Sequence, residues 1–136
     1  MAQKYILTHD LGTSSNKAVL FTLQGRLIAE ARQDYAVHYP RPKYAEQDPF
    51  DWLHAVYTTS RKALEKSGIK AEQVAGITFT CQMQTLVAVD AQGEPVMPAI
   101  SWLDTRGMEV LYDTLYPRPR IQGYHPLRLL QFLRIT

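Results

Sequence analysis

With 136 residues, the chain is long enough for one domain with a hydrophobic core, and its 46% hydrophobic and 21% charged residues are typical of a globular protein. A formal net charge of +2 is too small to indicate nucleic-acid binding, the N-terminus lacks the apolar run of a signal peptide, and no apolar run approaches the ~20 residues of a membrane span. The single cysteine, Cys81, excludes an internal disulfide, which fits a cytoplasmic protein. From these features together we expect contact with neither nucleic acid nor membrane.

The first third of the chain predicts a three-stranded antiparallel meander. Residues 5–8 form a short apolar run that leads into an Asp-Leu-Gly-Thr stretch, which is typical of a buried strand entering a tight turn. Residues 16–23 are rich in strand-forming side chains, and Gln24 and Gly25 after them are typical of a two-residue turn. Residues 26–35 continue as the third strand.

The next predicted element is a helix with start and stop signals. Asp48 suits the N-cap, Pro49 suits the first helical position, and Gly68 suits the position after the last turn. Helical spacing predicts one inward-facing stripe of six residues: Leu53, Val56, Tyr57, Ser60, Ala63 and Leu64.

More strands follow this helix. Residues 74–80 form another apolar run, and residues 85–89 and 96–102 are predicted strands on either side of a turn at 91–94. The order β-β-β-α-β with further strands and helices predicts a mixed α/β sheet layered with helices.

The last part of the chain is predicted to be helical. Asp104 is a candidate cap for a helix over 105–116, and residues 127–133 predict another helix. Four arginines near the end form a basic cluster that we interpret as a solvated or partner-facing surface: Arg118, Arg120, Arg128 and Arg134.

The turn after the first strand, residues 10–17, is the most informative stretch. Polyphosphate binding needs a cation, backbone amides that can approach oxygens, and small hydroxyl donors. Asp10 can hold Mg²⁺ at a strand end, Gly12 lets the backbone come close to phosphates, and Lys17 adds a positive charge. Three hydroxyl residues lie between them: Thr13, Ser14 and Ser15. The pattern also fits a Ser/Thr-rich β-turn without a ligand, and it is not a Walker loop because a strand follows it.

Four segments of the chain resemble known motifs. The stretch 10–17 resembles the first phosphate motif of the actin-like ATPases, Asp-x-Gly-Thr-Thr/Ser-Ser. Three others resemble motifs of the FGGY carbohydrate kinases: Glu-Gln-Asp-Pro at 46–49 followed by Trp52, the strand and loop at 76–84, and Pro-Ala-Ile-Ser-Trp-Leu-Asp-Thr-Arg at 98–106. They occur in family order along nearly the whole chain. The resemblance implies a ribonuclease H-like (actin-like ATPase) α/β fold, a mixed sheet with flanking helices, of which residues 1–136 are an incomplete N-terminal part, from the first, sugar-binding domain.

The resemblance also implies a role for each matching position. Asp10 would serve Mg²⁺, the residues after it would contact the phosphates of ATP, and a later loop would contact a sugar or polyol. The implied phosphate contacts are Gly12, Thr13, Ser14, Ser15 and Lys17, and the implied substrate contacts are Gln82, Met83, Gln84, Trp102 and Asp104.

Several of these positions allow a second interpretation. Lys17 stands where the family often has arginine, which removes a planar bidentate donor. Met83 and Gln84 are nearer to the Met-His of xylulokinase-like members than to the Arg-Glu of glycerol kinase-like members. Trp102 also fits a core tryptophan, and Asp104 also fits a simple helix cap.

Two residues near these motifs are expected to be structural. His9 stands where the family has an apolar residue, and we interpret it as a strand residue rather than a group acting near the metal. Cys81 is expected to be a small buried residue, because no base is positioned to make it a nucleophile.

The family's catalytic base, second phosphate motif and adenosine site lie downstream of residue 136. We therefore expect the intact protein to phosphorylate a sugar or polyol with ATP, and this chain, which lacks the second, ATP-binding domain, to be inactive alone. Surface that normally faces the missing part would leave an apolar patch that favours a homo-oligomer. The alternatives are an actin-like or chaperone-type ATPase module and a non-catalytic sugar-binding remnant.

Overall fold

The computed structural model describes residues 3–115, and the chain divides into two compact units, residues 1–103 and residues 104–136. The first unit contains the sheet and the long helix, together with the turn after the first strand and the loop at residues 82–84. No helix among the described residues is long and apolar enough to cross a membrane.

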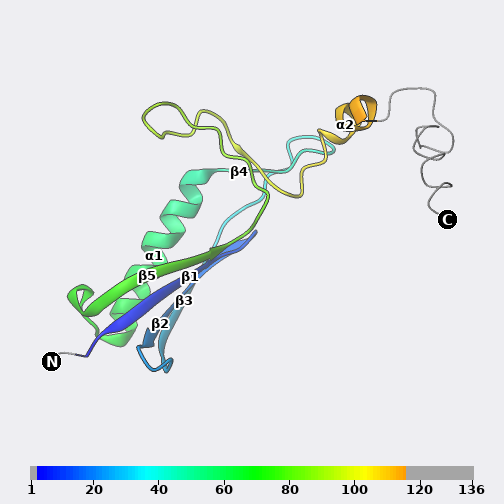
Figure 1. Ribbon diagram of the computed structural model, residues 1–136. Coiled ribbons are helices and arrows are strands. Elements are labelled where there is room, and N and C mark those ends of the chain that lie inside the picture. The colour runs from blue at the N-terminus through cyan, green and yellow to red at the C-terminus, as the bar shows by residue number, and fades with distance from the viewer. Residues whose placement is uncertain (1–2, 116–136) are drawn as a thin grey trace, which may run out of the picture. The chain divides into compact units, whose positions relative to one another are not determined.

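Four strands form one mixed sheet in the order β3-β2-β1-β5 (Figure 1). The strands are β1 (Tyr5–Leu11), β2 (Ser15–Thr22), β3 (Leu27–Asp34) and β5 (Val74–Cys81). The first three are antiparallel, which confirms the predicted meander, and β5 joins parallel to β1. Gly25 lies in the β2–β3 turn with φ +82°, a left-handed conformation that glycine adopts without strain. The predicted mixed α/β sheet is confirmed.

The long helix α1 (Pro49–Ser67) begins and ends where the sequence predicts. The carboxylate of Asp48 accepts a hydrogen bond from the backbone N–H of Phe50 at 2.9 Å, and Pro49 fills the first turn. Gly68 ends the helix in the left-handed conformation, with φ +68°. Local capping chemistry therefore decides both ends of the helix.

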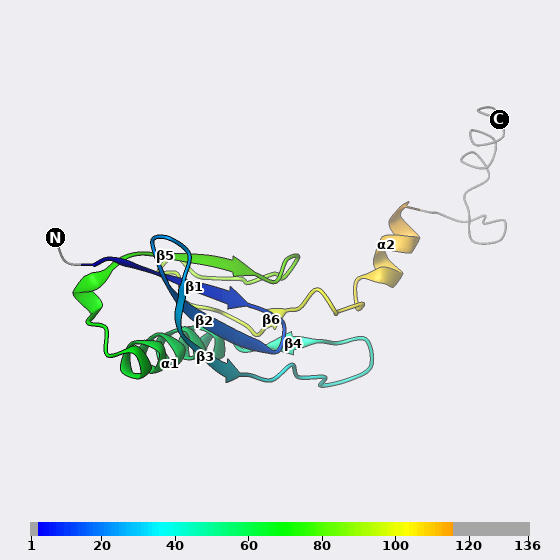
Figure 2. The same cartoon turned by 90° about the horizontal axis from the view of Figure 1, so that it is seen from below.

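The inward face of α1 is narrower and made of smaller side chains than the sequence predicts. The helix runs along one face of the sheet (Figure 2), and its buried residues are Ala55, Thr59 and Ala63. Leu53 and Tyr57 are 50% and 64% exposed, so their predicted place in the core is wrong. Small side chains let the helix backbone approach the sheet closely, and the large ones are left at the flank.

The core lies between α1 and the first three strands. Its buried residues are Tyr5, Leu7, Ala18, Leu20, Ala31 and Ala63. β5 lies beyond the cover of the helix, and its Ile77 and Phe79 are largely exposed. These exposed side chains agree with the expected apolar patch. The self-association inferred from the patch stays a prediction, which sedimentation at increasing protein concentration would measure.

A second, two-stranded sheet connects the start of α1 to the end of the first unit. β4 (Glu46–Gln47) pairs antiparallel with β6 (Ala99–Ile100), and a short 3₁₀ helix (Ala71–Gln73) precedes β5. The predicted turn near 91–94 is confirmed by a hydrogen bond from the Asp90 N–H to the Glu94 carbonyl. Strands were predicted at residues 85–89 and 96–102, on either side of this turn. Apart from the two residues of β6, these segments form only isolated bridges, so the prediction of two full strands is wrong.

The second unit contains α2 (Met108–Leu115), which starts later than the predicted residue 105. The side chain of Asp104 accepts from the backbone N–H of Arg106 at 2.9 Å, which closes a local turn before the helix. Asp104 is therefore not the cap of α2. The predicted helix at 127–133 and the basic cluster of arginines lie outside the described residues.

Candidate functional site

The hairpin between β1 and β2 is a tight turn that its own backbone closes. The N–H of Gly12 donates to the carbonyl of Ser15 at 3.0 Å, and the strands pair from Leu11 and Asn16 onward. A Cβ added at Gly12 would lie 3.4 Å from the Ser15 carbonyl oxygen, which is an ordinary contact distance.

Three consecutive carbonyls of the hairpin accept hydrogen bonds from residues far along the chain. The Tyr35 hydroxyl donates to the Gly12 carbonyl at 2.5 Å, and the Tyr35 backbone N–H donates to the Ser14 carbonyl at 3.0 Å. Nε2 of Gln47 donates to the Thr13 carbonyl at 2.9 Å. Neither Tyr35 nor Gln47 was predicted to belong to the site, and no local pattern indicates these contacts because their partners lie 23 and 34 residues away.

The predicted sugar loop starts directly beside the hairpin. The N–H of Gln82 donates to the Leu11 carbonyl at 2.8 Å, and its Nε2 donates to Oε1 of Gln47 at 2.9 Å. Gln84 has φ +58°, an uncommon conformation for a residue with a side chain, and such local strain is found at functional loops. Met83 beside it is 76% exposed.

Trp102 joins the loop region to the hairpin. Its indole N–H donates to the hydroxyl of Thr13 at 3.0 Å, although 89 residues separate the two. The side chain is half exposed, so the interpretation as a core tryptophan is wrong. Because the Thr13 oxygen accepts this bond, its own proton is left to donate elsewhere.

These residues line one shallow depression of about 390 Å³. Besides Cys81, its lining consists of predicted metal, phosphate and substrate residues: Asp10, Gly12, Thr13, Gln82, Met83, Gln84 and Trp102. Cys81 is exposed, so its predicted burial is wrong; β5 has no helix covering this end of the strand. Ser14 and Ser15 lie in the hairpin outside this lining.

Asp10 also borders a second, smaller depression of about 200 Å³ on the sheet, which Lys17 lines as well. The two residues are partners in the register of β1 and β2, and both side chains are exposed. Asp10 therefore borders both depressions, and Lys17, the other charged residue predicted to contact the phosphates, borders the smaller one.

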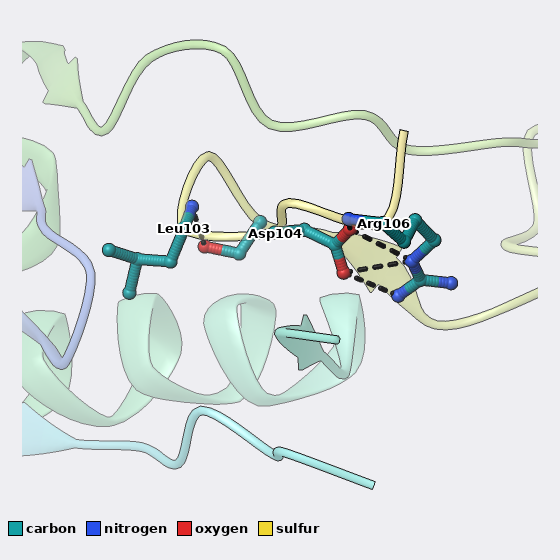
Figure 3. A network of polar contacts seen from close by, with 4 residues as sticks. Leu103, Asp104 and Arg106 are labelled. Atoms are coloured by element: carbon teal, nitrogen blue, oxygen red, sulfur yellow. Dashed lines mark hydrogen bonds and ion pairs between the residues drawn. The ribbon is translucent and has the colours of Figure 1, made fainter. Parts of the chain in front are cut away.

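Asp104, the last predicted substrate residue, belongs to the second unit. Its carboxylate, 3% exposed, forms a forked ion pair with Arg106, whose Nη2 lies 2.7 Å from Oδ2 (Figure 3). The pair gives Asp104 a structural partner within its own unit. A substrate role for Asp104 stays a prediction.

His9 lies in β1, as the sequence predicts, and its side chain is buried, which the sequence did not predict. Its Nδ1 lies 3.0 Å from Nδ2 of the Asn16 side chain, and its Nε2 lies 3.2 Å from the Ser60 hydroxyl on α1. Its side chain points to the α1 side of the sheet, whereas that of Asp10 points to the opposite side, because successive strand residues alternate. Burial lowers the pKa of His9 below the ordinary histidine value of 6.5.

The buried imidazole predicts a pH-dependent stability. Folding lowers the pKa of His9, so the unfolded chain binds a proton more readily, and the free energy of unfolding should fall as the pH drops below about 6.5. The extra slope is at most about 1.4 kcal/mol per pH unit. Urea unfolding between pH 5 and 8 should show this slope in the wild type and in His54→Gln, which changes an exposed histidine, but not in His9→Gln. Equal slopes in all three proteins would contradict the prediction.

The sequence of the chain matches one family model and is similar to known proteins. A family model described as the FGGY family of carbohydrate kinases, N-terminal domain, matches residues 5–116. A glycerol kinase from Ralstonia pickettii (strain 12J) is 38% identical over 104 residues, which are 76% of this chain and 21% of the relative. The chain thus spans about a fifth of the length of the curated relatives it matches.

Solved structures are similar over most of the chain. A gluconate kinase from Lactobacillus acidophilus superposes with a TM-score of 0.77 and 25% identity, covering 84% of this chain and 23% of that one. A ligand-bound xylulose kinase from the same organism gives a TM-score of 0.75 and 26% identity, covering 82% of this chain and 22% of that one.

Proposed function

Because the chain belongs to the FGGY family of carbohydrate kinases, we propose that it provides the phosphate-binding hairpin and part of the sugar pocket of an ATP-dependent sugar or polyol kinase. Its mixed sheet and flanking helix are part of the ribonuclease H-like, actin-like ATPase fold of that family. The observation that carries the proposal is the single depression in which the Gly12–Thr13 backbone meets the 82–84 loop and Trp102. Phosphoryl transfer requires the phosphate and its acceptor hydroxyl to lie side by side, as this arrangement allows.

Asp10 is the residue suited to hold Mg²⁺ with the phosphates of ATP. It is exposed at the end of β1 beside the hairpin depression, and a carboxylate is a ligand that Mg²⁺ prefers. One carboxylate is enough for such a site, because Mg²⁺ at phosphates is commonly held by one or two carboxylates together with phosphate oxygens and water. Bound there, the ion would neutralise charge on the phosphates.

Ligand type is proposed from the loop chemistry. Gln82, Gln84 and the face of Trp102 combine amide groups, which can donate to and accept from hydroxyls, with a flat apolar wall. This combination suits a polyhydroxylated substrate of the size of glycerol, a pentulose or an aldonate, the classes named by the relatives. Those relatives are all sugar or polyol kinases, which favours this function over a mechanical actin-like ATPase.

We also propose that the 136-residue chain binds ligands without turning them over. The reaction needs a base to take the proton from the acceptor hydroxyl, and among the described residues Asp10 is the only carboxylate on the hairpin depression. If Asp10 is committed to the metal, this base must come from another part of the protein, such as the ATP-binding domain proposed to complete the enzyme.

The test uses the isolated chain with MgATP and glycerol, D-xylulose or D-gluconate. Amide NMR spectra should show shifts of Gln82, Gln84 and Trp102 with at least one of these substrates, and a coupled assay should show no ADP release above background. Gln84→Ala should weaken the shifts, whereas Gln92→Ala, in the exposed turn, should not. Shifts confined to other regions would overturn the sugar site, and turnover by the chain alone would overturn its proposed inactivity.

A further inference from the structure

The peptide planes of the hairpin are oriented by donors on its outer side. Tyr35 and Gln47 hold the carbonyls of Gly12 and Thr13, as described above, at 2.5 and 2.9 Å. In a trans peptide, the C=O of one residue and the N–H of the next point in opposite directions across the same plane. Fixing the carbonyls of Gly12 and Thr13 therefore also fixes the N–H groups of Thr13 and Ser14, which point away from Tyr35 and Gln47.

Within residues 3–115, these two N–H groups donate to no protein acceptor. Consecutive N–H groups of a turn that have no protein partner can form a backbone nest that binds anions. If either peptide plane rotated, a carbonyl oxygen would replace an N–H group and repel a phosphate. The hairpin thus needs its carbonyls held before a phosphate arrives, because reorienting them on binding would weaken affinity.

Both holding side chains are set up as fixed donors. A tyrosine hydroxyl is protonated at neutral pH, and partial burial together with the negative charge of Asp10 raises the pKa of Tyr35 further, to about 12. Gln47 is 1% exposed, and its Nε2 lies within hydrogen-bond distance of two carbonyls, those of Thr13 and Ala36. Carbonyls only accept, so the amide of Gln47 has one allowed orientation.

The orientation of Gln47 has a second consequence. Its Oε1 must face Gln82, which donates to it through Nε2 at 2.9 Å. One buried amide therefore contacts both the hairpin and the first residue of the sugar loop.

We propose that Tyr35 and Gln47 are positioning residues that hold the hairpin carbonyls outward, so that the N–H groups of Thr13 and Ser14 form a preformed phosphate nest, with Gln47 coupling this nest to the sugar loop. The inference rests on the proposed phosphate role of the hairpin and assigns the residues that make that role effective. A purely structural role would instead lower the stability of the fold and leave the phosphate affinity of the folded chain unchanged.

The test compares Tyr35→Phe, which removes one hydroxyl, with Tyr39→Phe, which changes a tyrosine that is 65% exposed in the following loop. The probes are MgATP and magnesium tripolyphosphate, followed by the NMR shifts of the Thr13 and Ser14 amides of the folded chain. Tyr35→Phe should lower the affinity for both probes by about fivefold to tenfold, the effect of losing one orienting hydrogen bond. Tyr39→Phe should leave both affinities unchanged. Gln47→Met should lower them by at least as much as Tyr35→Phe.

The outcomes separate this inference from the proposed function. If the probes shift the hairpin amide signals of the wild type and Tyr35→Phe binds the probes equally well, the positioning role is wrong and the phosphate site stands. If the wild type shows no hairpin shifts with either probe, the phosphate site itself is wrong. If Gln47→Met does not fold, Tyr35→Phe alone decides, since it deletes only one atom.

Discussion

Replacing Asp10 with asparagine should abolish the magnesium dependence of ATP binding by the chain. Asparagine keeps the size and shape of the side chain but removes the negative charge that suits a hard divalent cation. Loss of even the outer partners of metal ligands costs about 10–100-fold in affinity, so loss of the carboxylate itself should cost at least that much. The measurement is a magnesium titration of ATP binding, followed by calorimetry or by the Thr13 amide shift.

The matched control for this substitution is Asp34→Asn. Asp34 ends β3 and is paired with Ser15 in the sheet register, so it lies at the same end of the sheet, and its ion pair with Arg32 is exposed. An exposed pair contributes little to stability, and its loss changes the net charge by the same amount as Asp10→Asn. Equal weakening in both variants would show that overall charge, not a metal site at Asp10, controls binding.

Replacing Leu20 with alanine should remove a large part of the stability of the fold. Leu20 is fully buried in β2, faces Leu7 in the register of β1, and belongs to the cluster that α1 covers. A buried leucine-to-alanine change costs about 2–5 kcal/mol, against a total stability of about 5–15 kcal/mol for typical domains. Leu20 and Leu7 are the only fully aliphatic side chains larger than alanine among the buried residues of this cluster, so a loss within that range is expected.

Urea unfolding followed by circular dichroism measures this loss. Leu23→Ala is the control, because Leu23 is exposed in the turn after β2, and its replacement should change the free energy of unfolding by less than about 0.5 kcal/mol. A cost for Leu20→Ala below about 1 kcal/mol would mean that the contact between α1 and the sheet is not the main core.

Features that depend on neighbours along the chain could be predicted from the sequence. The limits of α1 follow from Asp48, Pro49 and Gly68, whose caps need only backbone groups within a few residues. The meander follows from strand-forming runs joined by short turns. The order of the motifs was sufficient to predict the family.

Features that depend on distant parts of the chain could not be predicted in this way. Helical spacing placed Leu53 and Tyr57 in the core, but the sheet accepts only the narrow face of Ala55, Thr59 and Ala63. Cys81 has an apolar character that suggested burial, and the absence of a covering helix over β5 leaves it exposed.

The sequence by itself determined the chemistry available to this protein: a carboxylate, a glycine turn and hydroxyls at one strand end, with amides and a tryptophan later in the chain. Tertiary structure alone decided how these groups meet, through the bonds of Tyr35, Gln47 and Trp102 to a hairpin between 23 and 89 residues away. The physical reason is that a capping or turn hydrogen bond is chosen by nearby backbone geometry, whereas a bond across such a separation forms only when the packed sheet and helix have already brought both partners together.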